Sequence, residues 1–110
     1  MMGAPNVVRG GSHSGNIAAA DLARRGMLDI LSSDYVPSSL LMAALQLPMR
    51  VSGIDLPSAV RTVTRNPALA VDLDDRGEIA PGLRADMIQV HAAFEAPMVR
   101  SVWREGRRVA

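Results

Sequence analysis

One short apolar segment constrains the fold of this chain more than any other feature. Residues 27–31 read Met-Leu-Asp-Ile-Leu, with a helical pattern before them and Ser32, Ser33 and Asp34 after them. An apolar run of this length with these flanks favours a buried strand over a helix. A buried strand between helices indicates α/β architecture. Because one strand is not a sheet, we expect its partners to come from elsewhere and the chain to be a piece of something larger.

Glycine and proline delimit the remaining expected elements. Residues 1–15 are rich in glycine and predict a loop. Asn66-Pro67 should end the last long helix, and Pro48 should end the one before it. Helices are expected over residues 16–25, 37–47 and 54–65, with one more helical turn over 68–73. Strands are expected over residues 85–91, 98–104 and 107–109, the first two separated by a turn around 95–97.

Composition excludes several classes of function. The chain has 110 residues, 48% of them apolar and 21% charged, which is a globular balance. A net charge of +1 leaves no electrostatic footprint for a nucleic-acid or membrane-surface partner. The absence of cysteine excludes disulfides, thiolate metal sites and cysteine nucleophiles. No apolar run approaches the roughly 20 residues that span a bilayer, and no secretory signal is visible, so we expect a cytoplasmic protein.

A glycine-rich segment before the first expected helix is the first candidate site. It reads Arg-Gly-Gly-Ser-His-Ser-Gly-Asn over residues 9–16. Glycines let a ligand approach the backbone, and a helix start offers unpaired N–H groups to an anion. The side chains with donors suited to phosphate oxygens are Arg9, Ser12, His13, Ser14 and Asn16. Alternatively, Ser14 or Asn16 only caps the helix, and the glycines form a turn.

The second candidate is Asp34, just beyond the expected strand. Catalytic groups of α/β barrels lie at the C-terminal ends of the strands. A carboxylate there can bind a metal ion or exchange a proton with metal-bound water. The alternative makes Asp34 the N-cap of the helix that follows Pro37. The spacing leaves both interpretations open.

The remaining titratable residues carry weaker signals. His13 and His91 are the two histidines, and no complete metal-ligand spacing such as His-x-His is present. We expect a structural or surface role for His91. Asp72, Asp74 and Asp75, followed by Arg76-Gly77, predict a solvated turn.

Several motifs resemble one enzyme superfamily. Thr64-Arg65-Asn66-Pro67-Ala68 and Gly77-Glu78-Ile79-Ala80-Pro81-Gly82-Leu83-Arg84-Ala85-Asp86 resemble the C-terminal end of the amidohydrolase superfamily. Residues 3–16 and 28–37 narrow the resemblance to the PhnM family, the α-D-ribose 1-methylphosphonate 5-triphosphate diphosphatases of the carbon–phosphorus lyase pathway. The resemblance covers essentially all 110 residues.

The resemblance implies a (β/α)8 hydrolase that uses a divalent metal, zinc or a similar ion, in the complete enzyme. Residues 1–72 would be a C-terminal fragment of the barrel, from the end of strand 7 to helix 8, and residues 73–110 a short tail of the β subdomain. Family members cleave a ribosyl phosphonate 5-triphosphate to the 5-phosphate and diphosphate. Asp34 would match the superfamily aspartate that binds the metal and shuttles a proton, and the loop over residues 9–16 would face substrate phosphates.

The superfamily's other metal ligands, including its His-x-His, are missing from these residues. Catalytic metal sites need about three protein ligands per ion. We therefore expect this chain alone to bind no metal pair, to be inactive, and to self-associate or need the missing half of the barrel. The alternatives are an inactive remnant that acts at most as an interaction module, and the tail of another amidohydrolase such as a deaminase.

Overall fold

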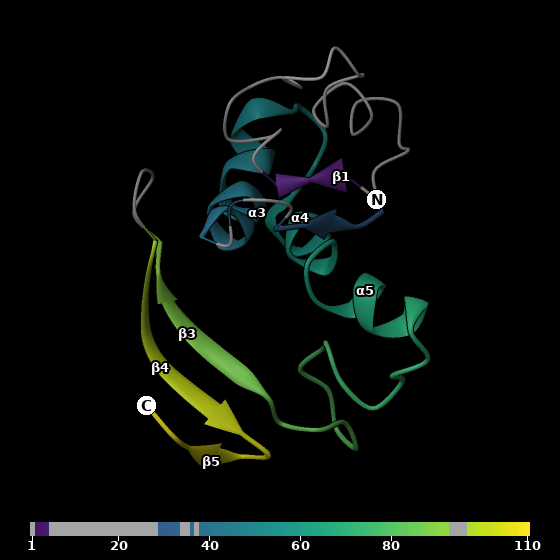
Figure 1. Cartoon of the computed structure of the whole chain (residues 1–110), viewed down its shortest axis with the longest axis vertical. Coiled ribbons are helices and arrows are strands. Elements are labelled where there is room, and N and C mark those ends of the chain that lie inside the picture. Colours follow the sequence, from purple (N-terminus) through teal and green to yellow (C-terminus); the bar gives the residue numbers. More distant parts are fainter. Residues whose placement is uncertain (1, 5–28, 34–35, 37, 93–96) are drawn as a thin grey trace.

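The computed structural model describes residues 2–4, 29–33, 36, 38–92 and 97–110. A two-stranded parallel sheet packs with three helices, and a three-stranded antiparallel sheet extends to one side of them (Figure 1). Residues 71–86 connect the two parts along the chain. The first part comprises β1 (Met2–Gly3), β2 (Leu31–Ser32), α3 (Ser39–Arg50), α4 (Leu56–Arg61) and α5 (Arg65–Ala70), and the second part comprises β3 (Met87–His91), β4 (Met98–Arg104) and β5 (Arg107–Arg108).

The buried strand has a partner within the chain. β1 pairs in parallel with β2, with Met2 opposite Leu31 and Gly3 opposite Ser32. The prediction of a loop throughout residues 1–15 is therefore wrong at Met2–Gly3, as is the expectation that all partners of the strand come from elsewhere. A two-residue strand is too short to show any periodicity. Within the described residues of the expected strand over 27–31, only Leu31 is in the strand; residues 27 and 28, like the expected helix over 16–25, lie outside the described residues.

Small side chains build the core between this sheet and the helices. Ala43 and Ala59 are fully buried, and their size allows α3 and α4 to pack closely. Leu31 is the residue that β2 contributes. The buried core cluster consists of Ala4, Leu31, Ala43, Leu47, Val51 and Ala59, with Leu40, Ile54 and Val63 packed against it.

The first described helix continues past its proline. We expected a helix over residues 37–47 that ends before Pro48, but α3 includes Pro48 and ends at Arg50. Pro48 has no N–H to donate to the carbonyl of Ala44, so the helix forgoes one hydrogen bond there. The Val51 N–H then donates to the carbonyl of Leu47 at 3.0 Å and closes the last turn.

The expected helix over 54–65 is two helices. Asp55 caps α4 by accepting the Ser58 N–H at 2.9 Å. Threonine hydroxyls mark the break between α4 and α5, since Thr62 Oγ1 donates to the Ala59 carbonyl at 2.6 Å and Thr64 Oγ1 to the Val60 carbonyl at 2.8 Å. Asn66-Pro67 does not end a helix but lies in the first turn of α5. Proline fits there because first-turn N–H groups have no partner within the helix.

The strands of the tail follow the predicted pattern closely. β4 covers the expected range of 98–104, whereas β3 begins two residues later than predicted, at Met87. β3 and β4 are antiparallel with an irregularity between Gln89 and Val90, and β5 pairs with β4. Glu105-Gly106, both with positive φ, connect β4 to β5. The turn expected around 95–97 lies mostly outside the described residues.

Candidate site at the carboxyl ends of the parallel strands

The residues predicted to carry the chemistry lie outside the part of the chain that the structure describes. The structure describes the residues that precede these segments in the chain, at the ends of β1 and β2. These predicted site residues are Arg9, Ser12, His13, Ser14, Asn16 and Asp34.

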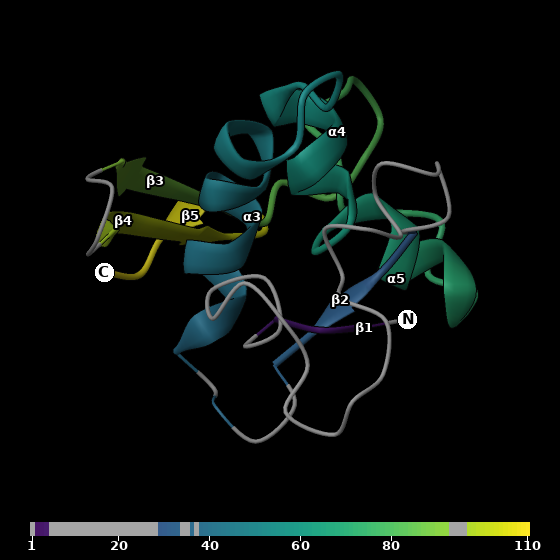
Figure 2. The same cartoon turned by 90° about the horizontal axis from the view of Figure 1, so that it is seen from above.

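Each candidate segment follows, in the sequence, the carboxyl end of one of the two parallel strands. β1 ends at Gly3, and the chain continues through buried Ala4 toward the glycine-rich segment. β2 ends at Ser32, and Asp34 follows two residues later. Because β1 and β2 are parallel neighbours, their carboxyl ends lie side by side (Figure 2). This edge is where α/β folds place ligands and catalytic groups.

The residues that flank Asp34 are joined by hydrogen bonds. The Val36 N–H donates to the carbonyl of Ser33 at 3.1 Å. The hydroxyl of Ser39, which is buried, donates to the Val36 carbonyl at 2.6 Å. The N-cap residue of α3 is Ser38, so the alternative that Asp34 is the N-cap of this helix is wrong.

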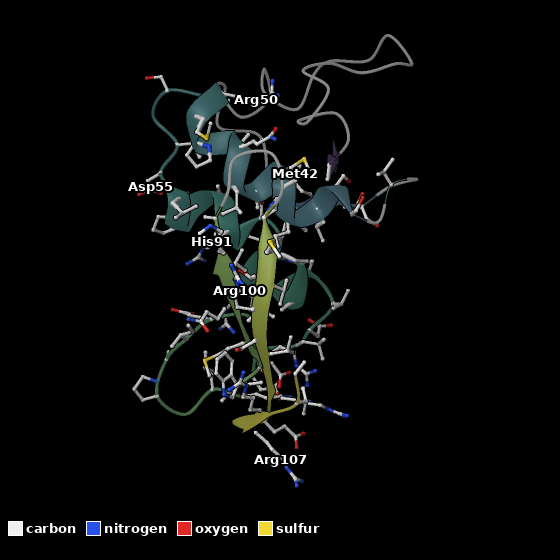
Figure 3. The ribbon with its side chains drawn as sticks, turned by 90° about the vertical axis from the view of Figure 1, so that its left-hand side faces the viewer. Met42, Arg50, Asp55, His91, Arg100 and Arg107 are labelled. Atoms are coloured by element: carbon white, nitrogen blue, oxygen red, sulfur yellow. The ribbon has the colours of Figure 1, made fainter. Side chains whose placement is uncertain are left out.

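The described residues do not gather a metal site. Among them, no group of three or more histidine, aspartate or glutamate side chains is placed to hold an ion. His91 is exposed at the end of β3 and labelled in Figure 3, in agreement with the surface role expected for it. Of the donors that the sequence indicated, Asp34 and His13 are of types that zinc accepts, but two donors are fewer than the roughly three that a catalytic site needs. These residues alone therefore do not fit a metal centre.

The structure reveals an arginine that joins α5 to the connecting segment. Arg65 Nη1 donates to the carbonyls of Asp74 at 3.0 Å and Arg76 at 2.8 Å, and its Nε lies 3.5 Å from Glu78 Oε2. Gly77 lies against the same arginine, because a Cβ at Gly77 would be 2.9 Å from Arg65 Cα. The partners of Arg65 are mostly backbone carbonyls, and no sequence spacing indicates them.

A second arginine joins the connecting segment to the sheet. Arg84 Nε lies 2.7 Å from Asp86 Oδ2, an ion pair in which the N–H is not aligned for a hydrogen bond, and its Nη2 lies 3.3 Å from Glu105 Oε1. Asp86 Oδ1 accepts the Glu105 N–H at 2.9 Å. This hydrogen bond and Arg84 lower the pKa of Asp86. Because Arg84 already faces two carboxylates, this cluster stabilises the fold and does not form an anion site.

The acidic turn that precedes Gly77 is solvated, as the sequence predicted. Asp72, Asp74 and Asp75 are exposed. A hydrogen bond from the Arg76 side chain lowers the pKa of Asp75. None of the helices in the described part of the chain is long and apolar enough to cross a bilayer.

Comparison with known proteins supports an amidohydrolase origin. Residues 4–110 match the family model described as the amidohydrolase family. The chain is 54% identical to an alpha-D-ribose 1-methylphosphonate 5-triphosphate diphosphatase of Escherichia coli K12, over 99% of this chain and 29% of that protein. An imidazolonepropionase of Deinococcus deserti is 38% identical over 71% of this chain and 21% of its own length.

A solved structure gives the same result for the fold. A crystal structure of an amidohydrolase from Thermotoga maritima matches 86% of this chain and 26% of that chain with a TM-score of 0.66 and 25% identity. The chain thus spans less than a third of the length of each of these relatives. The resemblance that the motifs indicated is confirmed, as is an α/β fold of the amidohydrolase type.

Proposed function

Because the chain belongs to the amidohydrolase family, we propose that it forms the C-terminal part of a hydrolase that cleaves α-D-ribose 1-methylphosphonate 5-triphosphate. The observation that carries this proposal is the 54% identity to the Escherichia coli diphosphatase over nearly the whole chain. The similarity to an imidazolonepropionase is lower, at 38% over 71% of the chain.

In this proposal, β1 and β2 are the last two strands of a (β/α)8 barrel. Their parallel pairing and the helices packed with them support this assignment. Residues 1–72 then belong to the barrel and residues 73–110 to a small β subdomain, which agrees with the separate antiparallel sheet. The rest of the barrel would come from the part of such an enzyme that this chain does not span.

Asp34 is the residue to which we assign the chemistry. Its carboxylate would accept a proton from the attacking water at the rim of the barrel, a role supported by its place in the sequence two residues beyond β2. A divalent metal, zinc or a similar ion, would polarise the phosphoryl group and the attacking water when bound to the complete enzyme. Asp34 would be one of its ligands, and the others would come from outside these 110 residues.

The glycine-rich segment would bind the phosphates. Its point of departure beside that of Asp34 supports this role. Arg9 and His13 would supply charged donors, and Ser12, Ser14 and Asn16 neutral ones. Water then cleaves the anhydride that links the sugar 5-phosphate to the two outer phosphates, its oxygen joining one product and its protons being shared between the products. The products are the 5-phosphate and diphosphate.

A chimeric enzyme tests the proposed function. Residues 1–110 replace the matching segment of the Escherichia coli diphosphatase, and diphosphate release from the ribosyl phosphonate triphosphate is measured. We expect turnover within about tenfold of that of the parent, because each charge-assisted hydrogen bond to a phosphate contributes about 1.5–3 kcal/mol and most of these bonds should be retained. A folded chimera that releases no diphosphate would contradict the proposal, and turnover of imidazolone propionate would favour the other relatives.

A further inference from the structure

The placement of the antiparallel sheet relative to the helices depends on the connecting segment. Among the described residues, the elements in extensive contact with one another belong to the same part, either to the helices and parallel sheet or to the antiparallel sheet. Figure 1 shows the connecting segment leading from α5 to β3. Because a linker without bonds of its own would let the sheet move, the bonds of this segment determine how the two parts are held.

Three consecutive carbonyl groups of the connecting segment are bonded in two directions. The carbonyls of Asp74 and Arg76 accept hydrogen bonds from Arg65 Nη1 in α5, at 3.0 and 2.8 Å. The Asp75 carbonyl between them accepts the Arg84 N–H at 2.6 Å. Residues 74–76 are therefore bonded at the same time to α5 and to the chain shortly before β3.

The other end of the segment is bonded to the turn between β4 and β5. The Gly106 N–H donates to the Ala85 carbonyl at 2.8 Å, and the Glu105 N–H donates to Asp86 Oδ1 at 2.9 Å. The Arg84 guanidinium forms ion pairs with the carboxylates of Asp86 and Glu105. A continuous series of hydrogen bonds and ion pairs thus runs from α5 to the antiparallel sheet.

Arg65, at the start of this series, does not favour its own helix. It is the first residue of α5, where the helix dipole disfavours a cation. Its side chain is 17% exposed, because the guanidinium lies against the connecting segment. The stabilising contribution of Arg65 therefore comes from the connecting segment and not from α5.

We propose that the connecting segment is a rigid brace between the two parts, that Arg65 fastens it to α5, and that this fastening keeps the antiparallel sheet folded in the 110-residue chain. Within β3, β4 and β5, all of whose residues the structure describes, Ser101 is the one buried residue. A sheet of this size needs a buried apolar face or a helix packed against it to be stable. The inference does not depend on the proposed function, and every residue in it belongs to this chain.

Arg65→Met tests the brace in the 110-residue chain, because methionine suits a helix and keeps an unbranched stem but has no N–H donor in its side chain. Urea unfolding is followed by helical ellipticity and by the fluorescence of Trp103, the single tryptophan, which lies in β4. The protein is kept at a concentration where light scattering gives the mass of the monomer. In the parent chain we expect the two midpoints to coincide. In Arg65→Met we expect the Trp103 midpoint at least about 0.5 M urea below the helical one, since the lost charge-assisted hydrogen bonds offset about one molar urea.

Arg61→Met is the matched control. Arg61 is exposed in the last turn of α4, and its side chain has no ion pair or hydrogen bond within the described residues. Its two midpoints should coincide as in the parent chain, and equal separation in both variants would overturn the inference. Coincident midpoints in Arg65→Met would also overturn it, since Arg65 would then contribute only to overall stability. Separate midpoints in the parent, or loss of the helical signal of Arg65→Met without urea, would likewise contradict the brace.

Discussion

Gly77 is a residue whose identity the structure constrains tightly. It has a φ of +93°, and an added Cβ would lie 2.9 Å from Arg65 Cα and 3.0 Å from the Thr64 carbonyl oxygen. Gly82 has a similar φ of +85° but nothing within 4 Å of an added Cβ. Gly82→Ala should therefore cost only the backbone strain, about 1–2 kcal/mol. Gly77→Ala should cost about 1–3 kcal/mol more, because the backbone must shift.

Urea denaturation of the two glycine variants measures this difference. Equal losses in the free energy of unfolding would show that α5 and the connecting segment are not packed as closely as the structure shows.

Asp86 should make stability depend on pH in the acid range. Its pKa is lowered by the Glu105 N–H and by Arg84. A carboxyl whose pKa is lower in the folded state stabilises the fold above its unfolded pKa, and this contribution is lost as the pH falls through the folded pKa. We expect Tm to fall as the pH drops below about 4, and Asp86→Asn to flatten that fall.

Thermal melts between pH 7 and pH 2.5 test this, with Asp74→Asn as the control. The Asp74 side chain has no ion pair or hydrogen bond within the described residues, so Asp74→Asn should show the same decrease of Tm with falling pH as the parent chain. If Tm falls with pH in Asp86→Asn as steeply as in the parent chain, Asp86 does not contribute to the loss of stability in acid. Some slope should remain in Asp86→Asn, because the pKa values of Asp55 and Asp75 are lowered as well.

Single residues were predictable where their role is local. The solvated turn at Asp72–Asp75 needs only a cluster of charges before Arg76-Gly77, and the structure confirms it. Arg65 and Asn66 were not predictable, because both donate to backbone carbonyls that are distant in sequence, and a carbonyl is present at every residue. The donor type of a side chain can be read from a sequence, but its backbone partner cannot.

Two prolines test how the position of a proline in a helix determines its effect on stability. Pro48 lies inside α3, where it withholds a donor, whereas Pro57 lies in the first turn of α4, where no donor is needed. Pro48→Ala should raise the free energy of unfolding by about 1–3 kcal/mol. Pro57→Ala should lower it by about 0.4–1 kcal/mol, because the unfolded chain gains freedom.

Thermal unfolding of both proline variants checks that the free energy of unfolding changes in opposite directions. A loss of stability in Pro48→Ala would mean that a bend at Pro48 is needed to seat the end of α3 on the core.

Elements were predictable when their periodicity was long enough to recognise. β4, with seven residues, was predicted to the residue, whereas β1, with two, was missed. The prediction for Pro67 was wrong because proline is found both at the end and at the beginning of helices. The hydrogen bonds of Thr62 and Thr64, which interrupt the helix before Pro67, decide that it begins one. The burial of β2 was foreseen, but its pairing with β1 depends on residues that are far apart in sequence.

At the scale of the whole molecule, exposed apolar side chains on the antiparallel sheet predict self-association. Ile88 is 51% exposed and Val99 48% exposed. Light scattering over a range of concentrations should show a mass that rises above that of the monomer. Ile88→Thr should weaken this association, because it removes apolar area and keeps strand propensity.

Ile79→Thr is the control for this experiment, since Ile79 is 84% exposed but lies outside the strands. If it weakens association as much as Ile88→Thr, the sheet is not the interface. A concentration-independent monomer in the parent chain would contradict the prediction entirely.

The residue types of the candidate site could be read from the sequence, but its geometry could not. Asp34 and the glycine-rich segment were singled out by residue type, and the parallel pairing shows that their segments leave neighbouring strand ends. In the proposed barrel, the other ligands of a catalytic metal would lie on strands outside these residues, so a sequence of this length could not give the full ligand set.

The kinetics of Asp34→Asn in the chimeric enzyme test the central claim most directly. Asparagine keeps the shape but loses the charge and the oxygen that accepts a proton. Diphosphate release and a thermal melt are measured side by side. We expect a Tm close to that of the parent chimera and a kcat lower by at least about 10²-fold, within the range of 10²–10⁴-fold for loss of a general base. A parental kcat in the folded variant would contradict the claim and remove Asp34 from the chemistry.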